Sequence, residues 1–370
     1  AGFSLMIYTF KGGVTLSKVV KAAYTAEAVA GFTHRTAIEE AARCLLCHDA
    51  PCSKGCPAGT DPAKFVRSIR FRNVKGAAET IRSNNVLGGS CARVCPYDRL
   101  CEEACSRCGI DRPIEIGKLQ RYAIEQEEIF GMKTLEAGEA KPGKVACIGA
   151  GPASLAAAAE LRKAGYAVTI FEKEEKAGGM LTYGIVPSRL PQSVIDHDVA
   201  MVEAMGVKFE FGKKVTIADV DDYDAVFVGT GLWGTKLPEI PGTELKGVYA
   251  AADYLKAART SGKQEGKKVV VIGGGDVAVD CAVTAKLLGA EDVRIVYRRT
   301  LEEAPGNMNE FQYALSLGIG MTTNMAPAAI EGAGKIEAMT FTGREGRLDG
   351  SELKLACDTV VFAIGQKAEI

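Results

Sequence analysis

KVACIGAGPASLAAAAELRKAGYAVTIFEK, residues 144–173, contains the pattern that decides the fold of this chain. An apolar run is followed by Gly149-x-Gly151-x-x-Ser154, then by an alanine-rich stretch and a second apolar run. The glycines allow a tight turn between strand and helix, and Ser154 is small enough for the helix to pack closely on the strand. The stretch therefore predicts a strand–helix–strand unit of a doubly wound parallel sheet.

The same unit has the features of a dinucleotide site. A pyrophosphate would lie at the helix N-terminus, where backbone N–H groups favour negative charge. Glu172 ends the second strand, where a carboxylate can accept hydrogen bonds from a ribose. The next stretch, AGGMLTYGIVPSRLP at residues 177–191, includes Gly178, Gly179 and Arg189 and indicates a second close backbone approach. FAD, a bulky cofactor lying along the chain, fits this pattern better than a nicotinamide nucleotide.

A second unit of the same design, KKVVVIGGGDVAVDCAVTAKLLGAEDVRIVYRR, occupies residues 267–299. Its second strand ends in Arg298 and Arg299, with no acid where Glu172 stood. Two guanidinium groups suit the 2′-phosphate of NADPH, which an acid would repel. The alternative is a solvated basic strand end, because arginines are common on protein surfaces. We expect a nicotinamide nucleotide here, NADPH rather than NADH.

Two shorter patterns indicate how these domains are connected. YDAVFVGTG at 223–231 and CDTVVFAIG at 357–365 each contain an aspartate, an apolar strand and a glycine. In a chain with two nucleotide-binding domains, such strands would mark the passages between them. We therefore expect the NAD(P) domain to be inserted in the FAD domain, to which the chain returns at its end.

Composition limits the classes of partner. A chain of 370 residues can form two or three domains with cores of their own. A net charge of -1 without a long basic run argues against nucleic acid. The apolar stretch GFSLMIYTF at 2–10 is too short to span a bilayer and lacks the flanks of a signal peptide. We expect no membrane partner and a cytoplasmic, reducing compartment, where clustered cysteines bind metal more often than they pair.

Nine of the twelve cysteines lie in two runs, RCLLCHDAPCSKGCP at 43–57 and CARVCPYDRLCEEACSRC at 91–108. Disulfides are disfavoured by compartment and chain size. Structural zinc would take four ligands per ion, often from paired C-x2-C motifs. Iron–sulfur clusters use C-x3-C-P spacings, and in two-cluster proteins a run's last cysteine binds the other cluster. Clusters also provide an outlet for single electrons beside a flavin, which zinc cannot, so we favour iron–sulfur over zinc.

The region around these runs is predicted to be helical. Between the runs, apolar positions suit two short amphipathic helices: Phe65, Ile69, Ala77, Ala78 and Ile81. The predicted fold class is α/β with an α-helical N-terminal iron–sulfur domain and two Rossmann-like nucleotide-binding domains. The expected domains are an unassigned segment at 1–35, the helical domain with two [4Fe–4S] clusters at 36–140, the FAD domain at 141–247, the NAD(P) domain at 248–354, and a return strand of the FAD domain at 355–370.

The ordered motifs RCLLCHDAPCSKGCP, CARVCPYDRLCEEAC, IEIGKLQRY, GAGPAS, RLP and GGGDVAVDC resemble the flavoprotein part of dihydropyrimidine dehydrogenase. The resemblance runs from about Ala37 to the end and is most specific at the cysteines. It is strongest to the separate bacterial subunit with FAD, NAD(P) and two [4Fe–4S] clusters. The glutamate synthase small (beta) subunit shares this plan and is the alternative. HDAPC and the Gln of KLQRY favour the pyrimidine enzyme, because glutamate synthases tend to have Glu there.

The resemblance implies a crossed set of cluster ligands. One [4Fe–4S] cluster would be held by Cys44, Cys47, Cys52 and Cys105, and the other by Cys56, Cys95, Cys101 and Gln120. Cys91 and Cys108 are then spare. The alternative for Gln120 is that it caps the helix following IEIGK.

The motifs and the resemblance together imply the nucleotide contacts. The expected FAD residues are Gly149, Gly151, Pro152, Ala153, Ser154, Glu172, Gly179, Met180, Leu181, Arg189, Val215, Gly231 and, from the helical domain, Val94. The expected NAD(P) residues are Gly273, Gly274, Gly275, Asp276, Val277, Arg298 and Arg299. In this family a further Gly-Asp flavin motif follows the VFAIGQ strand, and we expect the FAD domain to be incomplete at Ile370.

The implied function is that of an electron-entry subunit. Hydride and electron transfer belong to the cofactors, so no general acid or base is expected. The family reduces uracil or thymine at an FMN in a TIM barrel, which takes about 250 residues. We expect that barrel on a partner subunit, hence a hetero-oligomer. A non-enzymatic alternative is a zinc-clamped interaction module beside degenerate nucleotide domains.

Overall fold

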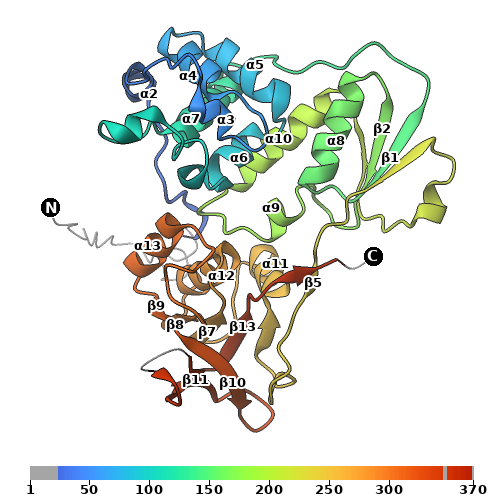
Figure 1. Ribbon diagram of the computed structural model, residues 1–370. Helices are drawn as coiled ribbons and strands as arrows, with labels where there is room; N and C mark the ends of the chain where they lie inside the picture. Colours follow the sequence, from blue (N-terminus) through green and yellow to red (C-terminus); the bar gives the residue numbers. More distant parts are fainter. Residues whose placement is uncertain (1–23, 345–347, 369–370) are drawn as a thin grey trace, which may run out of the picture. The chain divides into compact units, whose positions relative to one another are not determined.

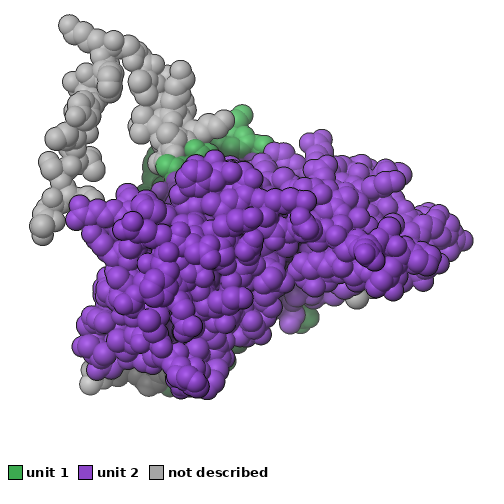
Figure 2. Space-filling model, turned by 90° about the horizontal axis from the view of Figure 1, so that it is seen from above, with its two compact units in different colours: residues 1–26, 238–249, 260–363 green, residues 27–237, 250–259, 364–370 purple. Residues whose placement is uncertain are grey.

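The chain path alternates between two units in the computed structural model, which describes residues 24–344 and 348–368. Figure 2 shows unit 2 in purple and unit 1 in green. Unit 2 comprises residues 27–237, 250–259 and 364–370, and unit 1 comprises residues 1–26, 238–249 and 260–363. Most of unit 1 therefore interrupts unit 2 along the chain. Residues 1–23 of the unassigned N-terminal segment lie outside the described part.

The N-terminal part of unit 2 is helical, as predicted (Figure 1). Its helices are α2 (His34–Ala42), α3 (Pro51–Lys54), α4 (Pro62–Arg70), α5 (Val74–Asn84), α6 (Gly88–Val94) and α7 (Ile116–Ile129). Short 3-10 turns span Tyr97–Arg99 and Ser106–Gly109. The apolar positions predicted for the two helices between the cysteine runs are fully buried in α4 and α5, which confirms that prediction: Phe65, Ile69, Ala77, Ala78 and Ile81.

Local capping explains where these helices begin. The Asp61 side chain accepts the Lys64 N–H at the start of α4, and Asn73 accepts the Gly76 N–H at the start of α5. Such caps satisfy N–H groups that have no partner within the helix. The helices enclose a core that includes Cys101, and three further cysteines pack against it: Cys44, Cys52 and Cys105.

The second part of unit 2 is a parallel sheet with strand order β3-β2-β1-β4. The sheet is formed by β1 (Lys144–Ile148), β2 (Ala167–Phe171), β3 (Lys208–Glu210) and β4 (Ala225–Val228). Helix α8 (Pro152–Lys163) follows β1, and α9 (Met180–Tyr183) and α10 (Gln192–Ala204) lie between β2 and β3. β1 pairs with β2 on one side and β4 on the other, so the Gly149 turn leaves the centre of the sheet. This is the doubly wound unit predicted from residues 144–173.

Unit 1 contains a five-stranded sheet of order β6-β13-β7-β8-β9. Its strands are β6 (Val248–Ala250), β7 (Lys268–Ile272), β8 (Asp292–Val296), β9 (Gly320–Thr322) and β13 (Thr359–Phe362), with α12 (Asp276–Leu287) between β7 and β8 and α13 (Met308–Ser316) before β9. An antiparallel sheet joins β10 (Met325–Glu331), β11 (Ala338–Gly343) and β12 (Glu352–Ala356). β7, α12 and β8 form the second predicted strand–helix–strand unit.

The chain returns to unit 2 later than predicted. The segment 355–370 was expected to be a strand of the FAD domain, but β13 pairs in parallel with β7 along its whole length and is fully buried in unit 1. Unit 2 resumes at Ile364, and β14 (Gln366–Lys367) then pairs with β5 (Gly234–Thr235). Residues 250–259, which include most of α11 (Ala251–Ser261), also belong to unit 2. None of the described helices is long and apolar enough to cross a bilayer.

Candidate cofactor sites

Four cysteines from the two runs line one cavity. Cys44, Cys47 and Cys52 of the first run face this space together with Cys105 of the second. The cavity is partly open to solvent, and its other lining residues are mostly apolar. This is the set of side chains that the resemblance assigns to one cluster. Across the described residues, no three His, Cys, Asp or Glu side chains converge on a point that could hold one metal ion.

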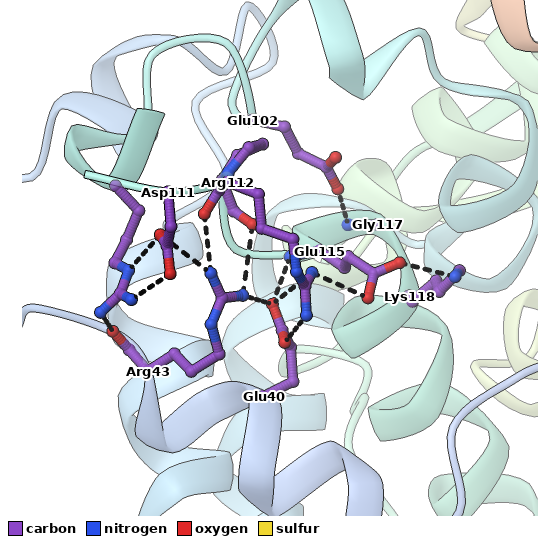
Figure 3. Close-up of polar contacts among 10 residues, drawn as sticks. Glu40, Arg43, Glu102, Asp111, Arg112, Glu115, Gly117 and Lys118 are labelled. Carbon is purple, nitrogen blue, oxygen red and sulfur yellow. Dashed lines mark hydrogen bonds and ion pairs between the residues drawn. The ribbon is translucent and has the colours of Figure 1, made fainter. Parts of the chain in front are cut away.

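Ion pairs tie the loop after the second run to α2, beside the cavity (Figure 3). Arg43 donates to the Arg112 carbonyl oxygen at 2.8 Å and to Asp111 at 3.2 Å. Glu40, which is buried, accepts hydrogen bonds from Arg43, from Arg112 at 2.9 Å and from the Glu115 N–H at 3.0 Å. A buried carboxylate needs such compensation. The network therefore holds the segment that follows Cys105 against the segment that directly precedes Cys44.

The thiol pKa values show how closely these cysteines are grouped. Burial, together with the nearby Cys105 and Cys44, raises the pKa of Cys52 to about 11. Several buried thiolates cannot share one region unless a cation compensates their charge, and coordination to a metal deprotonates a thiol outright. The donor set of this cavity therefore fits a thiolate-bound metal cluster.

A second group contains Cys56, Cys95 and Cys101. Burial, then Glu102 and Cys56 nearby, raises the pKa of Cys101 to about 12. The pKa of Cys95 is also raised, first by a hydrogen bond with Cys91 and then by burial, with Cys101 and Cys56 contributing. The structure thus brings together the three cysteines assigned to the second cluster. It also places Cys91, which was taken as spare, beside them.

Gln120 lies on the same side as this second group. It is the fifth residue of α7, whose N-cap is Glu115, so it does not cap that helix and the capping alternative is wrong. Its Nε2 donates to the Gly88 carbonyl oxygen at 2.9 Å. The pKa of Cys91 is lowered to about 6, chiefly by a hydrogen bond from Cys95. Hydrogen bonds from Gln120 and Asn85 lower it further. Gln120 therefore faces α6 next to the cysteine group.

The glycine turn after β1 is closely surrounded by backbone. Gly149 has a φ of +93°, and a β-carbon there would lie 2.7 Å from the Gly229 carbonyl oxygen. A β-carbon on Gly151, by contrast, would meet nothing closer than the Gly229 carbonyl oxygen at 4.0 Å. Gly151 is the N-cap of α8, with Pro152 and Ala153 as the first helical residues. A small residue is thus required at Gly149 by the fold, whereas Gly151 leaves the helix N-terminus accessible to a phosphate.

The third position of the motif is accommodated by a glycine that the sequence reasoning missed. Ser154 is fully buried, and a β-carbon on Gly229 would lie only 2.1 Å from its Oγ. Gly229 directly follows β4. Its lack of a side chain leaves the space that the Ser154 side chain of α8 occupies. The Gly that follows an apolar parallel strand beside the motif was the available signal.

Glu172 is fixed at the mouth of this turn. Its Oε2 accepts the Ala150 N–H at 2.7 Å, its Oε1 accepts the Glu174 N–H at 2.9 Å, and the side chain is 7% exposed. A carboxylate held in this way is oriented before a ligand arrives. The structure therefore places the predicted ribose-binding acid next to the predicted phosphate-binding turn.

The second glycine pair packs directly on the first motif. Gly179 has a φ of +54°, and a β-carbon there would lie 2.9 Å from the Gly151 Cα, while the Gly178 N–H donates to the Ala150 carbonyl oxygen at 2.8 Å. α9 begins at the next residue, and its Leu181 is buried in the unit 2 core. The loop after β2 therefore returns to the dinucleotide turn.

The other expected flavin residues lie around this region. Val94, at the end of α6, packs against the core formed mainly by the parallel sheet and its helices. Val215 packs against a smaller cluster that includes Phe171. Gly231 follows β4 with a φ of +75°, and Arg189 is a half-buried residue of the loop before α10. Val94 is thus one point at which the cysteine-bearing helix meets the predicted FAD domain.

The turn after β7 in unit 1 follows the same plan. A β-carbon on Gly273 would lie 2.5 Å from the Ala363 carbonyl oxygen, and one on Gly274 would lie 2.5 Å from the Tyr297 ring. Gly275 is the N-cap of α12, which begins with Asp276 and Val277. A β-carbon on Gly275 would meet no atom closer than 3.9 Å, so the helix N-terminus is open at this residue.

Arg298 and Arg299 are exposed just after β8. Neither guanidinium forms a hydrogen bond or an ion pair with any residue in the described ranges 24–344 and 348–368. Both cations are therefore available to a ligand, although exposed arginines are also common without one.

Two family models match the chain. Residues 21–131 match the model described as dihydropyrimidine dehydrogenase domain II, 4Fe-4S cluster, and residues 143–370 match pyridine nucleotide-disulphide oxidoreductase. The second match covers more than half of the chain. Together they confirm a helical iron–sulfur domain followed by FAD and NAD(P) domains.

Solved structures show the same fold at low identity. FprA from Mycobacterium tuberculosis in complex with NADPH is 20% identical, with a TM-score of 0.53, over 62% of this chain and 72% of that chain. The amine oxidase HisD from Pseudomonas geniculata N1 is 23% identical, with a TM-score of 0.56, over 83% of this chain and 45% of that chain.

Curated relatives are much closer in sequence. The NAD-dependent dihydropyrimidine dehydrogenase subunit PreT of Escherichia coli O157:H7 is 47% identical over 94% of this chain and 84% of that protein. The glutamate synthase [NADPH] small chain of Escherichia coli K12 is 33% identical over 90% and 78%, respectively. The predictions of an oxidoreductase with iron–sulfur, flavin and nicotinamide cofactors are thus confirmed. The chain belongs to the pyridine nucleotide-disulphide oxidoreductases and, within them, to the family of the PreT subunits of dihydropyrimidine dehydrogenase.

Proposed function

We propose that this chain is the electron-entry subunit of a dihydropyrimidine dehydrogenase, which oxidises NAD(P)H and supplies electrons for the reduction of uracil or thymine to the 5,6-dihydropyrimidine. The observation that carries the proposal is the cavity shared by Cys44, Cys47, Cys52 and Cys105, in the same unit as the Gly149 turn. A thiol-lined cavity and a dinucleotide turn in one unit suit electron transfer, whereas a zinc-clamped module would not need the turn.

Each cofactor would be held by the residues described above. When bound, FAD would accept a hydride from NAD(P)H and release its electrons singly to the clusters. Cys44, Cys47, Cys52 and Cys105 would hold one cluster. Cys56, Cys95, Cys101 and the Oε1 of Gln120 would hold the other, because the Nε2 of Gln120 is engaged by Gly88.

The nicotinamide site would distinguish its ligands through two exposed arginines. The PreT relatives are named NAD-dependent, and the glutamate synthase relative is named for NADPH. The Gly273–Gly275 turn suits the pyrophosphate common to both nucleotides. Arg298 and Arg299 are available for the additional 2′-phosphate of NADPH. We therefore propose that the site accepts NADH and uses the arginine pair when NADPH binds.

The pyrimidine would be reduced on a partner. A TIM barrel of about 250 residues is the family's site for that step. The described residues instead form helices, a four-stranded and a five-stranded sheet, and two small antiparallel sheets. The subunit naming of the relatives implies a partner. We propose a cytoplasmic hetero-oligomer in which that partner carries FMN.

The test is to purify the chain with its native partner and measure its colour, iron, zinc and flavin. A brown protein with flavin and iron whose NAD(P)H oxidation depends on uracil supports the proposal. Oxidation that depends on glutamine plus 2-oxoglutarate would support the glutamate synthase alternative. A colourless protein that contains zinc would establish the interaction module.

A further inference from the structure

Three charged side chains are completely buried between the helical part of unit 2 and its parallel-sheet part. Arg82 lies on α5, Glu127 on α7 and Asp198 on α10, and each side chain is 0% exposed or within 1% of it. Arg82 donates from Nε and Nη2 to Glu127 Oε2 at 2.8 and 2.7 Å, and from Nη1 to Asp198 Oδ1 at 2.6 Å. The guanidinium therefore links the cysteine-bearing helices to α10.

Asp198 also binds the backbone of α6. Its Oδ2 accepts the Ser90 N–H at 2.7 Å, and its Oδ1 accepts the Gly89 N–H at 3.2 Å. These are N–H groups of the first turn of α6, which have no partner within the helix. Both carboxylate oxygens are thus used, and α6 is attached to α10 at its beginning.

The contact between these helices leaves little room for a side chain at Gly89. A β-carbon on Gly89 would lie 3.1 Å from Asp198 Oδ1 and 3.2 Å from the side chain of Val194. At the other end of α6, Val94 packs against the core of the parallel-sheet part, and Cys95 is the C-cap of the helix. Asp198 therefore holds the beginning of the helix that ends at Val94 and has Cys95 as its C-cap.

Stability alone does not account for this arrangement. Replacing buried ion networks by apolar residues is often neutral or stabilising, because the desolvation of the charges costs as much as their attraction returns. What buried ions do provide in some proteins is a defined relative placement of the elements they join. Here those elements carry a proposed cluster ligand on one side and the flavin-binding sheet on the other.

We propose that Asp198 is a positioning residue that, together with Arg82, fixes α6 and its terminal Cys95 at a set distance from the flavin. This inference rests on the proposed function, because it concerns electron transfer between the FAD and the second cluster. Single-electron transfer slows steeply with distance, so a small displacement of α6 lowers that rate and leaves hydride transfer from NAD(P)H unchanged.

Two variants test the proposal in the intact chain. Asp198→Asn removes one acceptor oxygen and the negative charge, while the remaining Arg82 and Glu127 pair stays neutral as a whole. Gly89→Ala leaves all charges in place and pushes α6 from α10, and it raises the helix propensity of α6. Asp196→Asn is the matched control, because Asp196 lies on the same helix, is exposed and bonds Gln192.

The first measurement is amide hydrogen exchange at Gly89 and Ser90, which needs no activity. We expect both amides to exchange about tenfold faster or more in Asp198→Asn, and to remain as in the wild type in Asp196→Asn. The second is the rate of flavin reduction by NAD(P)H, followed by rapid-freeze detection of cluster reduction. In both Asp198→Asn and Gly89→Ala, the cluster step should slow relative to the wild type, with flavin reduction unchanged.

Wild-type exchange in Asp198→Asn together with a wild-type cluster step in Gly89→Ala would overturn the inference. If Asp198→Asn does not fold, Gly89→Ala alone decides, since a purely structural role would leave its cluster step unaffected. A wild-type protein whose clusters never receive electrons from NAD(P)H would instead contradict the proposed function, and the exchange measurement would still test the role of Asp198.

Discussion

Arg107 Nη1 donates a hydrogen bond to the Arg43 carbonyl oxygen at 3.1 Å, across 64 positions of sequence. Arg107 follows Cys105 by two residues, and Arg43 directly precedes Cys44. The bond therefore joins the end of the second cysteine run to the beginning of the first. It brings a thiol from each run to one cavity, as a crossed set of ligands requires.

Replacing Cys105 tests that crossed set. Cys105→Ser should reduce the iron content from about eight to about four atoms per chain, because only the cluster that uses Cys105 loses a thiolate. Iron analysis with flavin quantification measures this directly. Cys108→Ser is the control, since Cys108 is exposed and its Sγ donates to the backbone carbonyl oxygens of Glu102 and Glu103. Loss of all iron in Cys105→Ser, or an equal loss in the control, would contradict the assignment.

Gln120 provides a test of the second cluster. An amide oxygen is an uncharged ligand, whereas a cysteine thiolate adds a negative charge, and ligand charge is one determinant of cluster potential. Gln120→Cys should keep about eight irons and lower the potential of one cluster, while Gln120→Ala should lose about four irons. Redox titration and iron analysis measure these outcomes. Full iron and an unchanged titration in Gln120→Ala would show that Gln120 is not a ligand.

The arginine pair after β8 should determine the response to the 2′-phosphate. Changing Arg298 and Arg299 to Gln should weaken NADPH binding by about tenfold or more, because each charge-assisted hydrogen bond contributes roughly 1.5–3 kcal/mol. NADH binding should change little. Arg294→Gln, within β8 itself, is the control, since Arg294 donates a hydrogen bond to Thr322. Binding titrations decide, and equal losses for both nucleotides would assign the arginines a structural role.

Ser154 and Gly229 share a space that holds only one side chain, and a double substitution can move that side chain from residue 154 to residue 229. Gly229→Ala places a methyl group 2.1 Å from Ser154 Oγ, so it should destabilise the FAD turn by about 1–3 kcal/mol and reduce flavin content. Ser154→Gly removes the hydroxymethyl group and should restore flavin in the double variant. Thermal unfolding and absorbance of the flavin report both effects. A double variant no better than Gly229→Ala would mean that this contact does not limit the turn.

Much of the fold could be predicted because its signals are local. The glycine turns, the flanking apolar runs and the cysteine spacings each lie within about 30 residues, so a strand–helix–strand unit or a ligand run can be recognised from sequence alone. The helices of the cysteine region were likewise predicted from the periodicity of Phe65, Ile69 and Ile81.

Contacts between distant residues could not be predicted in this way. Arg82 and Asp198 are 116 positions apart, and nothing near either residue marks it as buried. A charged residue on a helix is most often solvated, so its burial becomes visible only when the tertiary partner is known. Gly229 is similar, because its lack of a side chain matters only once Ser154 lies opposite.

The return strand was misplaced for a related reason. β13 has an apolar sequence like that of β4, and such a pattern alone does not say which sheet a strand joins.

In the proposed function, electrons from a nicotinamide nucleotide pass through this chain to a pyrimidine on a partner. The most direct measurement is anaerobic NAD(P)H oxidation by the purified complex, with and without uracil, using wild type and Cys52→Ser. We predict oxidation that depends on uracil, yields dihydrouracil in equal amount and is lost in Cys52→Ser, whose thiol lines the cavity. Oxidation that is independent of uracil, or uracil reduction that persists in Cys52→Ser, would contradict the account.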